Sequence, residues 1–199
     1  MIEQMKVIYL DTETTGLTNA EICQLSYITD NGIEVYGTNY FFKVFNMNPH
    51  AQAVHGYSLE MLDELSSGKT FDEHIDAIER DFSDAMIVAH NAAFDIMMLK
   101  AEFVRRGRVF NPERYLCTMR FMTPYLKLNK SSGCGYKYPR LHELVAAYLN
   151  DYTAINDLVY ELFGVRSAFH DARFDAASLY LAVHSASGII DKLKEAVCV

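Results

Sequence analysis

Residues 5–17 read MKVIYLDTETTGL and join an apolar run directly to a pair of acids. The apolar half is rich in residues that favour β-strands, so it predicts a buried first strand. Alternate side chains of a strand share a face, so Asp11 and Glu13 project together while Thr12 points away. Two adjacent carboxylates repel each other unless one is protonated or a cation lies between them. The stretch therefore predicts either a solvated strand end or a metal-binding position.

Two more strand-like runs follow the first. Residues 23–29 (CQLSYIT) form the second, and residues 33–45 form a third, longer one. Between them, Asn31 and Gly32 are a strong hairpin signal, because both residues accept a positive φ angle. We therefore expect the chain to open as an antiparallel meander.

Helices and parallel strands are expected after the meander. Ser58 and Thr70 each favour the start of a helix, the second with Glu73 as its capping-box partner. Residues 85–89 (AMIVA) predict a short buried strand that leads into a helix over residues 93–106, which is the order of a parallel α/β unit. The remaining expected elements are a strand at 114–119 and helices at 141–149 and 171–185.

Length and composition favour one domain. The chain has 199 residues, of which 50% are hydrophobic, so it can bury a substantial core. We predict one α/β domain over residues 1–199, with its core at about residues 5–187. No run of about eighteen apolar residues occurs and acids interrupt the N-terminal stretch, so no membrane segment is expected. Scattered cysteines indicate neither a zinc site nor a disulfide framework and favour a reducing, cytoplasmic location. They are Cys23, Cys117, Cys134 and Cys198.

The net charge of -8 argues against a broad basic surface for nucleic acid, although it leaves room for a small footprint. One segment departs from this balance. Residues 127–140 (KLNKSSGCGYKYPR) contain four Lys or Arg residues and no acid. This segment is expected to be a loop, either a solvated connector or a flap that touches a phosphate backbone. It does not match a nucleotide-binding glycine loop, because no strand leads into it.

Two further acids stand where α/β folds build sites. Asp95 falls in the first turn of the helix that follows residues 85–89, a position that the helix dipole also favours. Asp175 belongs to HDARFD, residues 170–175, which opens the last predicted helix. Residues five apart on a helix are separated by about 140°, so His170 is expected on the loop just before it. Asp171 suits the N-cap position of that helix.

Three segments together resemble a known family. DTETTGL (residues 11–17), HNAAFD (90–95) and HDARFD (170–175) are similar, in order and spacing, to the three motifs of the DnaQ-like, or DEDDh, 3′-5′ exonucleases. AVHG (53–56) resembles the short stretch through which members touch the terminal nucleotide. The motif spelling is most similar to the epsilon proofreading subunits of bacterial replicative DNA polymerases. The resemblance implies a ribonuclease H-like α/β fold with a central mixed five-stranded sheet flanked by helices.

The same resemblance implies a mechanism. Two divalent cations, Mg²⁺ or Mn²⁺, would be held by Asp11, Glu13, Asp95 and Asp175. His170 would act as the general base. The implied reaction removes 5′-mononucleotides from the 3′ end of single-stranded or frayed DNA.

The resemblance and the turn after the acids also indicate substrate contacts. The residues expected to make them are Thr14, Thr15, Gly16, Leu17, Val54, His55, Asn91 and Phe94. Core packing is the alternative for Leu17 and Phe94, and a cap at the end of a strand is the alternative for Asn91. Tyr57 departs from the isoleucine-like residue expected after His-Gly, which weakens the expected contact with the terminal base.

Other functions stay open at the level of the sequence. An exoribonuclease or an enzyme that trims short oligonucleotides would use the same chemistry, although the motif spelling favours DNA. A non-catalytic binding module of a polymerase assembly is a third alternative, but all four acids and the histidine are present, which favours activity. A DNA polymerase is a candidate partner, yet residues 188–199 are shorter than the extended tail of epsilon subunits. The oligomeric state is not predicted.

Overall fold

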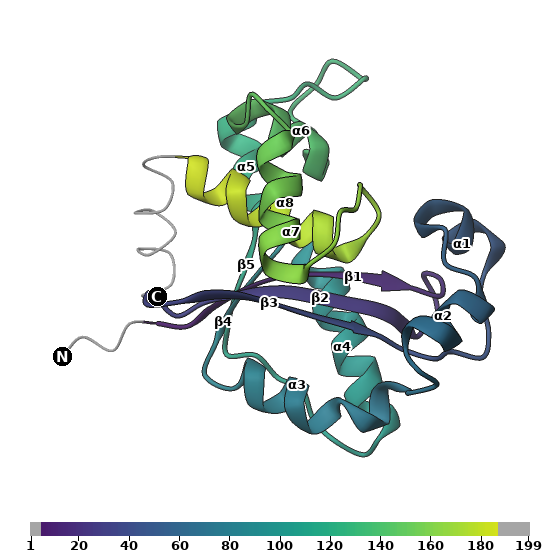
Figure 1. The fold of residues 1–199 in the computed structure, drawn as a ribbon. Coiled ribbons are helices and arrows are strands. Elements are labelled where there is room, and N and C mark those ends of the chain that lie inside the picture. Colours follow the sequence, from purple (N-terminus) through teal and green to yellow (C-terminus); the bar gives the residue numbers. More distant parts are fainter. Residues whose placement is uncertain (1–4, 187–199) are drawn as a thin grey trace.

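The computed structural model describes residues 5–186, so the expected core limit at residue 187, the segment 188–199 and Cys198 lie outside the described residues. Its centre is a five-stranded sheet in the order β3-β2-β1-β4-β5 (Figure 1). The strands are β1 (Val7–Thr14), β2 (Ile22–Asp30), β3 (Val35–Phe41), β4 (Met86–Ala89) and β5 (Arg114–Cys117). β1 pairs antiparallel with β2 and parallel with β4. This mixed sheet confirms the predicted fold class.

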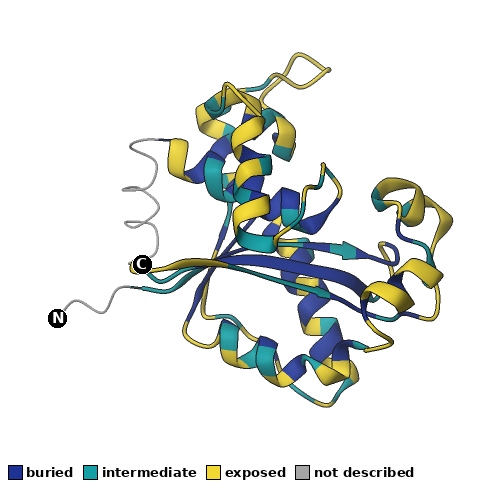
Figure 2. Ribbon diagram, in the orientation of Figure 1, coloured by how far each residue is buried: buried dark blue, intermediate teal, exposed yellow. Residues whose placement is uncertain are grey.

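Helices cover both faces of the sheet. α3 (Ile75–Phe82) and α4 (Ala92–Arg105) lie on one face, and α5 (Thr118–Leu126), α6 (Leu141–Tyr148), α7 (Thr153–Phe163) and α8 (Ala172–Ser185) lie on the other (Figure 1). The sheet between these layers is largely buried (Figure 2). Alternate residues of β1 supply both cores, since Ile8 and Leu10 pack in the cluster that includes α4 while Tyr9 packs in the cluster that includes α8.

The predicted hairpin is confirmed. Asp30 pairs with Val35 across it, and Gly32 takes a positive φ of 76°. β3 ends at Phe41 and is thus shorter than the strand expected over residues 33–45. The chain leaves the sheet there because it must reach α1 (Pro49–His55), where the N–H of Asn48 donates to the carbonyl of Thr15 (2.9 Å). This detour brings α1 and α2 (Leu59–Leu65) to the carboxyl end of β1 (Figure 1).

Cap residues in the sequence predict helix starts well. Ser58 caps α2, and Thr70 with Glu73 forms a capping box, although over a short 3₁₀ helix (η1, Phe71–Glu73) that precedes α3. Three helices, α1, α5 and α7, are not among the elements predicted from the sequence. The N-cap residues of α5 and α7, Cys117 and Tyr152, make no side-chain capping hydrogen bond, and α5 contains Pro124. The strand expected at 114–119 was too long, because α5 begins directly after β5.

Among the helices of residues 5–186, none combines the length and hydropathy needed to cross a bilayer.

Candidate active site

The carboxylates predicted to bind metal come from three elements that meet at one edge of the sheet. β4 ends at Ala89, opposite Leu10, while β1 continues past it. The two acids of β1 therefore project beyond the end of β4, where the chain turns into α4. Asp95 lies in the first turn of α4, and Asp175 lies in the first turn of α8.

Glu13, His170 and Asp175 converge at this edge. One ligand atom from each lies within 4.8 Å of the others. His170 is exposed on the loop before α8, as predicted, with a positive φ of 69°. Its backbone N–H donates to Asp175 Oδ2 (3.0 Å), so the aspartate holds the loop that carries the histidine.

Thr12 makes a contact that the sequence analysis missed. It points away from the two acids of its strand, as expected, but its Oγ1 donates to Oδ1 of the buried Asp95 (2.8 Å). Ile8, Leu10 and Thr12 alternate along the same strand, so all three face α4. The position of Thr12 against α4 could therefore have been predicted from this alternation. Thr12 thus helps to hold the carboxylate of α4 in place.

Burial raises the pKa of all four acids, and repulsion by neighbouring acids of the cluster adds to the effect at Asp11 and Glu13. Burial raises the pKa of Asp11 well above its ordinary value, and Asp175, Asp95 and Glu13 add to the effect. Burial, followed by the charge of Asp175, raises the pKa of Glu13 to about 9. Burial raises the pKa of Asp95 and that of Asp175 to about 7. The protein thus holds these carboxylates together at a cost that a bound cation would relieve.

The donor set fits a hard divalent cation. Asp175 Oδ1 is buried and has no hydrogen-bond partner among the described residues. A buried carboxylate oxygen without a partner is costly unless an ion or water satisfies it. Carboxylate oxygens are the ligands that Mg²⁺ and Mn²⁺ prefer, and the cluster contains no thiolate.

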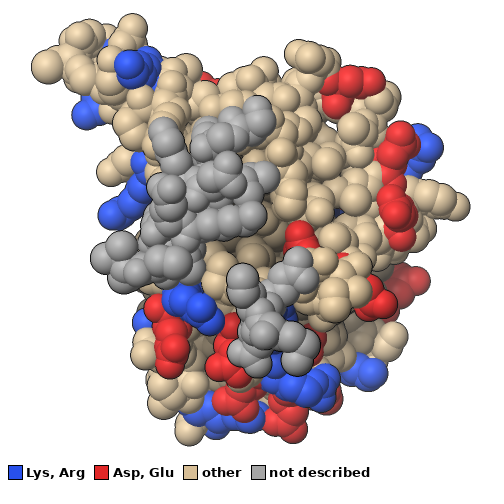
Figure 3. Space-filling model, turned by 90° about the vertical axis from the view of Figure 1, so that its left-hand side faces the viewer, with Lys and Arg blue, Asp and Glu red and all other residues tan. Residues whose placement is uncertain are grey.

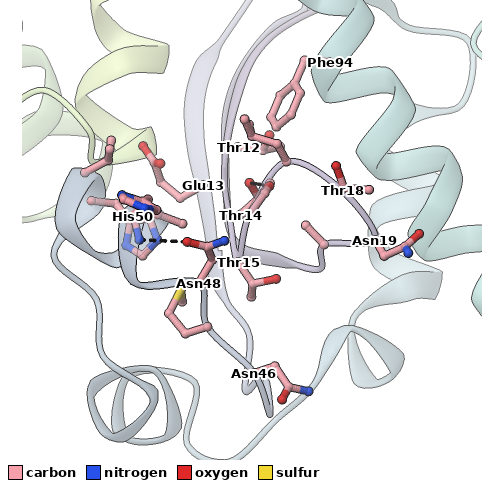
Figure 4. A pocket seen from close by; sticks show the side chains of 17 residues that line it. Thr12, Glu13, Thr14, Thr15, Thr18, Asn19, Asn46, Asn48, His50 and Phe94 are labelled. Atoms are coloured by element: carbon pink, nitrogen blue, oxygen red, sulfur yellow. Dashed lines mark hydrogen bonds between the residues drawn. The ribbon is translucent and has the colours of Figure 1, made fainter.

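A cavity of about 810 Å³ lies beside the acids. Figure 4 shows it between Glu13 and Thr15 at the end of β1, His50 of α1 and Phe94 of α4. Seven of the eight predicted substrate contacts line it: Thr14, Thr15, Gly16, Leu17, Val54, His55 and Phe94. Leu17 is 80% exposed and Val54 is 55% exposed, so neither is a core residue. Phe94 is half-buried: it lines the cavity and also packs against the core, so both roles considered for it apply.

Asn91 does not line this cavity. It is exposed at the N-cap position of α4, with left-handed backbone angles (φ 75°, ψ 43°) and no capping hydrogen bond from its side chain. Asparagine tolerates this conformation better than most residues. The left-handed backbone of the turn from β4 into α4 is therefore enough to explain why asparagine occupies this position.

Asp171 is the N-cap of α8, as predicted, and it is also the centre of a polar network that the sequence analysis missed. Its carboxylate accepts from the N–H of Arg173 (3.0 Å), from Gln24 Nε2 (3.0 Å) and from the hydroxyl of Tyr57 (3.0 Å). Burial alone would raise the pKa of Asp171, but hydrogen bonds from Arg173 and Gln24 hold it below its ordinary value. Asp171 is thus a paired, structural carboxylate.

This network explains the departure at Tyr57. The tyrosine is buried, its ring stacks on that of His55 (centroids 5.4 Å apart), and its N–H donates to His55 Nδ1 (3.0 Å). Its hydroxyl reaches Asp171, and the residue is not part of the cavity lining. Tyr57 therefore joins the end of α1 to the loop that carries His170.

A mixed sheet in this order, with acids at the end of its central strand and at the starts of two flanking helices, defines the ribonuclease H-like class of exonuclease folds. The model of the RNase T family, described as Exonuclease, matches residues 8–177 and so spans all three motifs. The chain therefore belongs to this family of DnaQ-like 3′-5′ exonucleases. Comparison with curated protein sequences gives no match.

Solved structures of exonuclease I share this fold. E. coli exonuclease I in complex with a dA16 oligonucleotide has a TM-score of 0.69 at 16% identity, covering 96% of this chain and 43% of that chain. Exonuclease I from Methylocaldum szegediense has a TM-score of 0.66 at 18% identity, covering 96% and 43%. At such identities the likeness concerns the fold, and the chain spans less than half the length of these relatives.

Proposed function

We propose that this chain is a metal-dependent 3′-5′ exonuclease that removes 5′-mononucleotides from single-stranded or frayed DNA ends, acting as one cytoplasmic domain. The observation that supports this most directly is that ligand atoms of Glu13, His170 and Asp175 lie within 4.8 Å of one another, and that Glu13 also lines the cavity. Burial raises the pKa of Asp11, and the charges of Asp175, Asp95 and Glu13 raise it further, which supports including Asp11 in the same group of acids. Oδ1 of Asp175, which is buried and has no hydrogen-bond partner in the described part of the chain, supports a bound cation at this position.

Each residue has a distinct task in this proposal. Two Mg²⁺ or Mn²⁺ ions would be held by Asp11, Glu13, Asp95 and Asp175; when bound, such a pair activates water and stabilises the leaving 3′-oxygen. His170 takes the proton of the attacking water, and its exposed position leaves it free to pass that proton to solvent.

The cavity takes the 3′-terminal nucleotide. Leu17 and Val54 offer exposed apolar surface to the base, while Thr15 and His55 offer polar groups to the sugar and phosphate. DNA is the proposed substrate because of the motif spelling and because a solved structure of the same fold carries a dA16 oligonucleotide. An RNA substrate and a DNA polymerase partner remain predictions from the sequence.

The test is digestion of matched 5′-labelled DNA and RNA oligomers with Mg²⁺, with Mn²⁺ and with excess chelator. We expect stepwise shortening from the 3′ end in either metal, none in chelator, and faster cutting of single strands than of blunt duplex. A circular single strand of the same sequence is the control. Digestion that survives chelation, or cutting of the circle at the linear rate, would contradict the proposal.

A further inference from the structure

Residues 127–140, here named the basic arm, project from the molecule between α5 and α6 (Figure 1). The arm is a hairpin rather than a featureless connector. Asn129 and Tyr136 form a bridge, and the N–H of Lys137 donates to the carbonyl of Leu128 (2.8 Å). Gly133 and Gly135 both take positive φ values near the tip. The arm thus presents its side chains on a defined backbone.

The arm concentrates positive charge on an acidic protein. Its cations are Lys127, Lys130, Lys137 and Arg140, and it contains no acid. Within residues 5–186 only one of the four, Lys137, has an ion-pair partner, Glu143 of α6. The uppermost lobe of the space-filling view, at the height of the arm in Figure 1, carries Lys and Arg side chains (Figure 3). Three cations of the arm are therefore available to an external anion.

The base of the arm is tied to the active-site edge. Nε2 of His90 donates to the carbonyl of Pro139 (2.9 Å), and His90 directly precedes the turn into α4. On the other side, the ring of His142 meets the edge of Phe169 (centroids 6.4 Å apart), the neighbour of His170. In space, the base of the arm therefore contacts residues of, or next to, the second and third sequence motifs. The base of the arm is thus close to the loop that carries His170, the proposed general base.

Two aromatic residues alternate with the cations. Tyr136 is 44% exposed and Tyr138 is 56% exposed, on either side of Lys137. Exposed aromatic rings among cations are the pattern with which proteins hold single strands, because rings stack on bases while cations meet phosphates. We infer that the basic arm binds single-stranded nucleic acid on the nucleotides upstream of the one in the cavity. This inference rests on the proposed function of the cavity.

The test compares a short and a long substrate. The arm variant carries Lys127→Glu, Lys130→Glu and Arg140→Glu. The charge-matched control carries Lys69→Glu, Arg80→Glu and Lys100→Glu, of which Arg80 and Lys100 lie on α3 and α4, across the sheet from the arm. We measure hydrolysis of the p-nitrophenyl ester of thymidine 5′-monophosphate, which needs only the cavity, and binding of a labelled 20-nucleotide single strand at several salt concentrations.

We expect the arm variant to hydrolyse the ester like the wild type and to bind the long strand at least tenfold more weakly. Its plot of log Kd against log salt should lose about 2 units of slope, because each phosphate contact to a single strand contributes about 0.7. A second variant, Tyr136→Ala with Tyr138→Ala, should weaken binding with the slope retained. The control should bind nearly as the wild type does.

The inference would be overturned if the arm variant and the control bind the strand equally weakly, or if the arm variant binds it as the wild type does. The arm would then face a protein partner or solvent instead. Failure of the wild type to hydrolyse the ester would instead count against the proposed function. The strand-binding comparison would still judge the arm in that case, because it needs no turnover.

Discussion

Two aspartates, four positions apart at the start of α8, stand in opposite electrostatic environments. Asp171 accepts hydrogen bonds from Arg173, Gln24 and Tyr57, and those from Arg173 and Gln24 hold its pKa low against the effect of burial. Oδ1 of Asp175 has no hydrogen-bond partner within residues 5–186, and burial raises the pKa of Asp175 to about 7. A carboxylate that already accepts several hydrogen bonds gains little from binding a cation. A carboxylate that lies beside other acids and lacks a hydrogen-bond partner gains much more. This difference supports Asp175, rather than Asp171, as the proposed metal ligand.

The first prediction separates ligand from base. Asp175→Asn removes a charged ligand, so manganese binding and turnover should be lost together. His170→Ala leaves the four carboxylates in place, so manganese should still bind while turnover falls by about 10²- to 10⁴-fold, the usual cost of losing a general base. Calorimetric titration with Mn²⁺ and single-turnover cleavage measure the two effects.

Asp171→Asn is the internal control for this comparison, and it should retain manganese binding. If His170→Ala loses manganese as strongly as Asp175→Asn does, the histidine is a metal ligand rather than the base, an arrangement that the short distances among the three groups would also permit.

At the scale of elements, α7 packs directly on the backbone of β3. A Cβ atom placed on Gly37 would lie 2.7 Å from Phe163 Cε1 and 3.0 Å from Leu162 Cβ. Glycine in a strand commonly marks such a close approach of another element. The absence of a side chain at Gly37 therefore sets the distance between this helix and the sheet.

The second prediction concerns this contact. Gly37→Val adds a residue that favours strands, yet it should lower the free energy of unfolding by about 1–3 kcal/mol, because the helix must move or its side chains must leave their rotamers. Urea unfolding measures the change. Val35→Thr, at a more exposed position of β3, should change stability by no more than about 0.5 kcal/mol. If Gly37→Val and the wild type have equal free energies of unfolding, α7 can shift away from β3 at no measurable cost, and the prediction is wrong.

At the scale of the whole molecule, the acid cluster links stability to pH. The folded-state pKa of Glu13 is about 9 and those of Asp95 and Asp175 are about 7, all above the ordinary values of 4.5 and 3.8. Between about pH 4 and these values the metal-free folded state holds more protons than the unfolded state. The stabilising contribution of these groups is therefore present at low pH and lost as pH rises.

The third prediction follows from this sign. Without metal, Asp175→Asn should become more stable than the wild type as pH rises from about 4 to 8, because residue 175 of the variant has no carboxyl group to deprotonate. Added Mn²⁺ should stabilise the wild type most at the high end of this range. Thermal unfolding of both proteins at each pH, with and without Mn²⁺, measures the difference. A difference that is constant with pH would mean that the acids are not electrostatically strained.

Local patterns in the sequence determined a large part of this protein. The alternation of a strand put Asp11 and Glu13 on one face, the Asn-Gly pair gave the hairpin, and Asp171 had the chemistry of an N-cap. These features depend on residues close in sequence, whose geometry the backbone sets. The three motifs added the family, which the match over residues 8–177 confirms.

Only the tertiary structure decided which distant residues support the site. Thr12 reaches Asp95, Tyr57 reaches Asp171, and His90 holds Pro139, each across a large separation in the chain. The helices α5 and α7 were missed for a related reason, since their N-cap residues are Cys117 and Tyr152, which are not typical caps, and their burial against the sheet is a long-range effect. A local pattern can state which face a side chain takes, but packing selects the partner that it meets there.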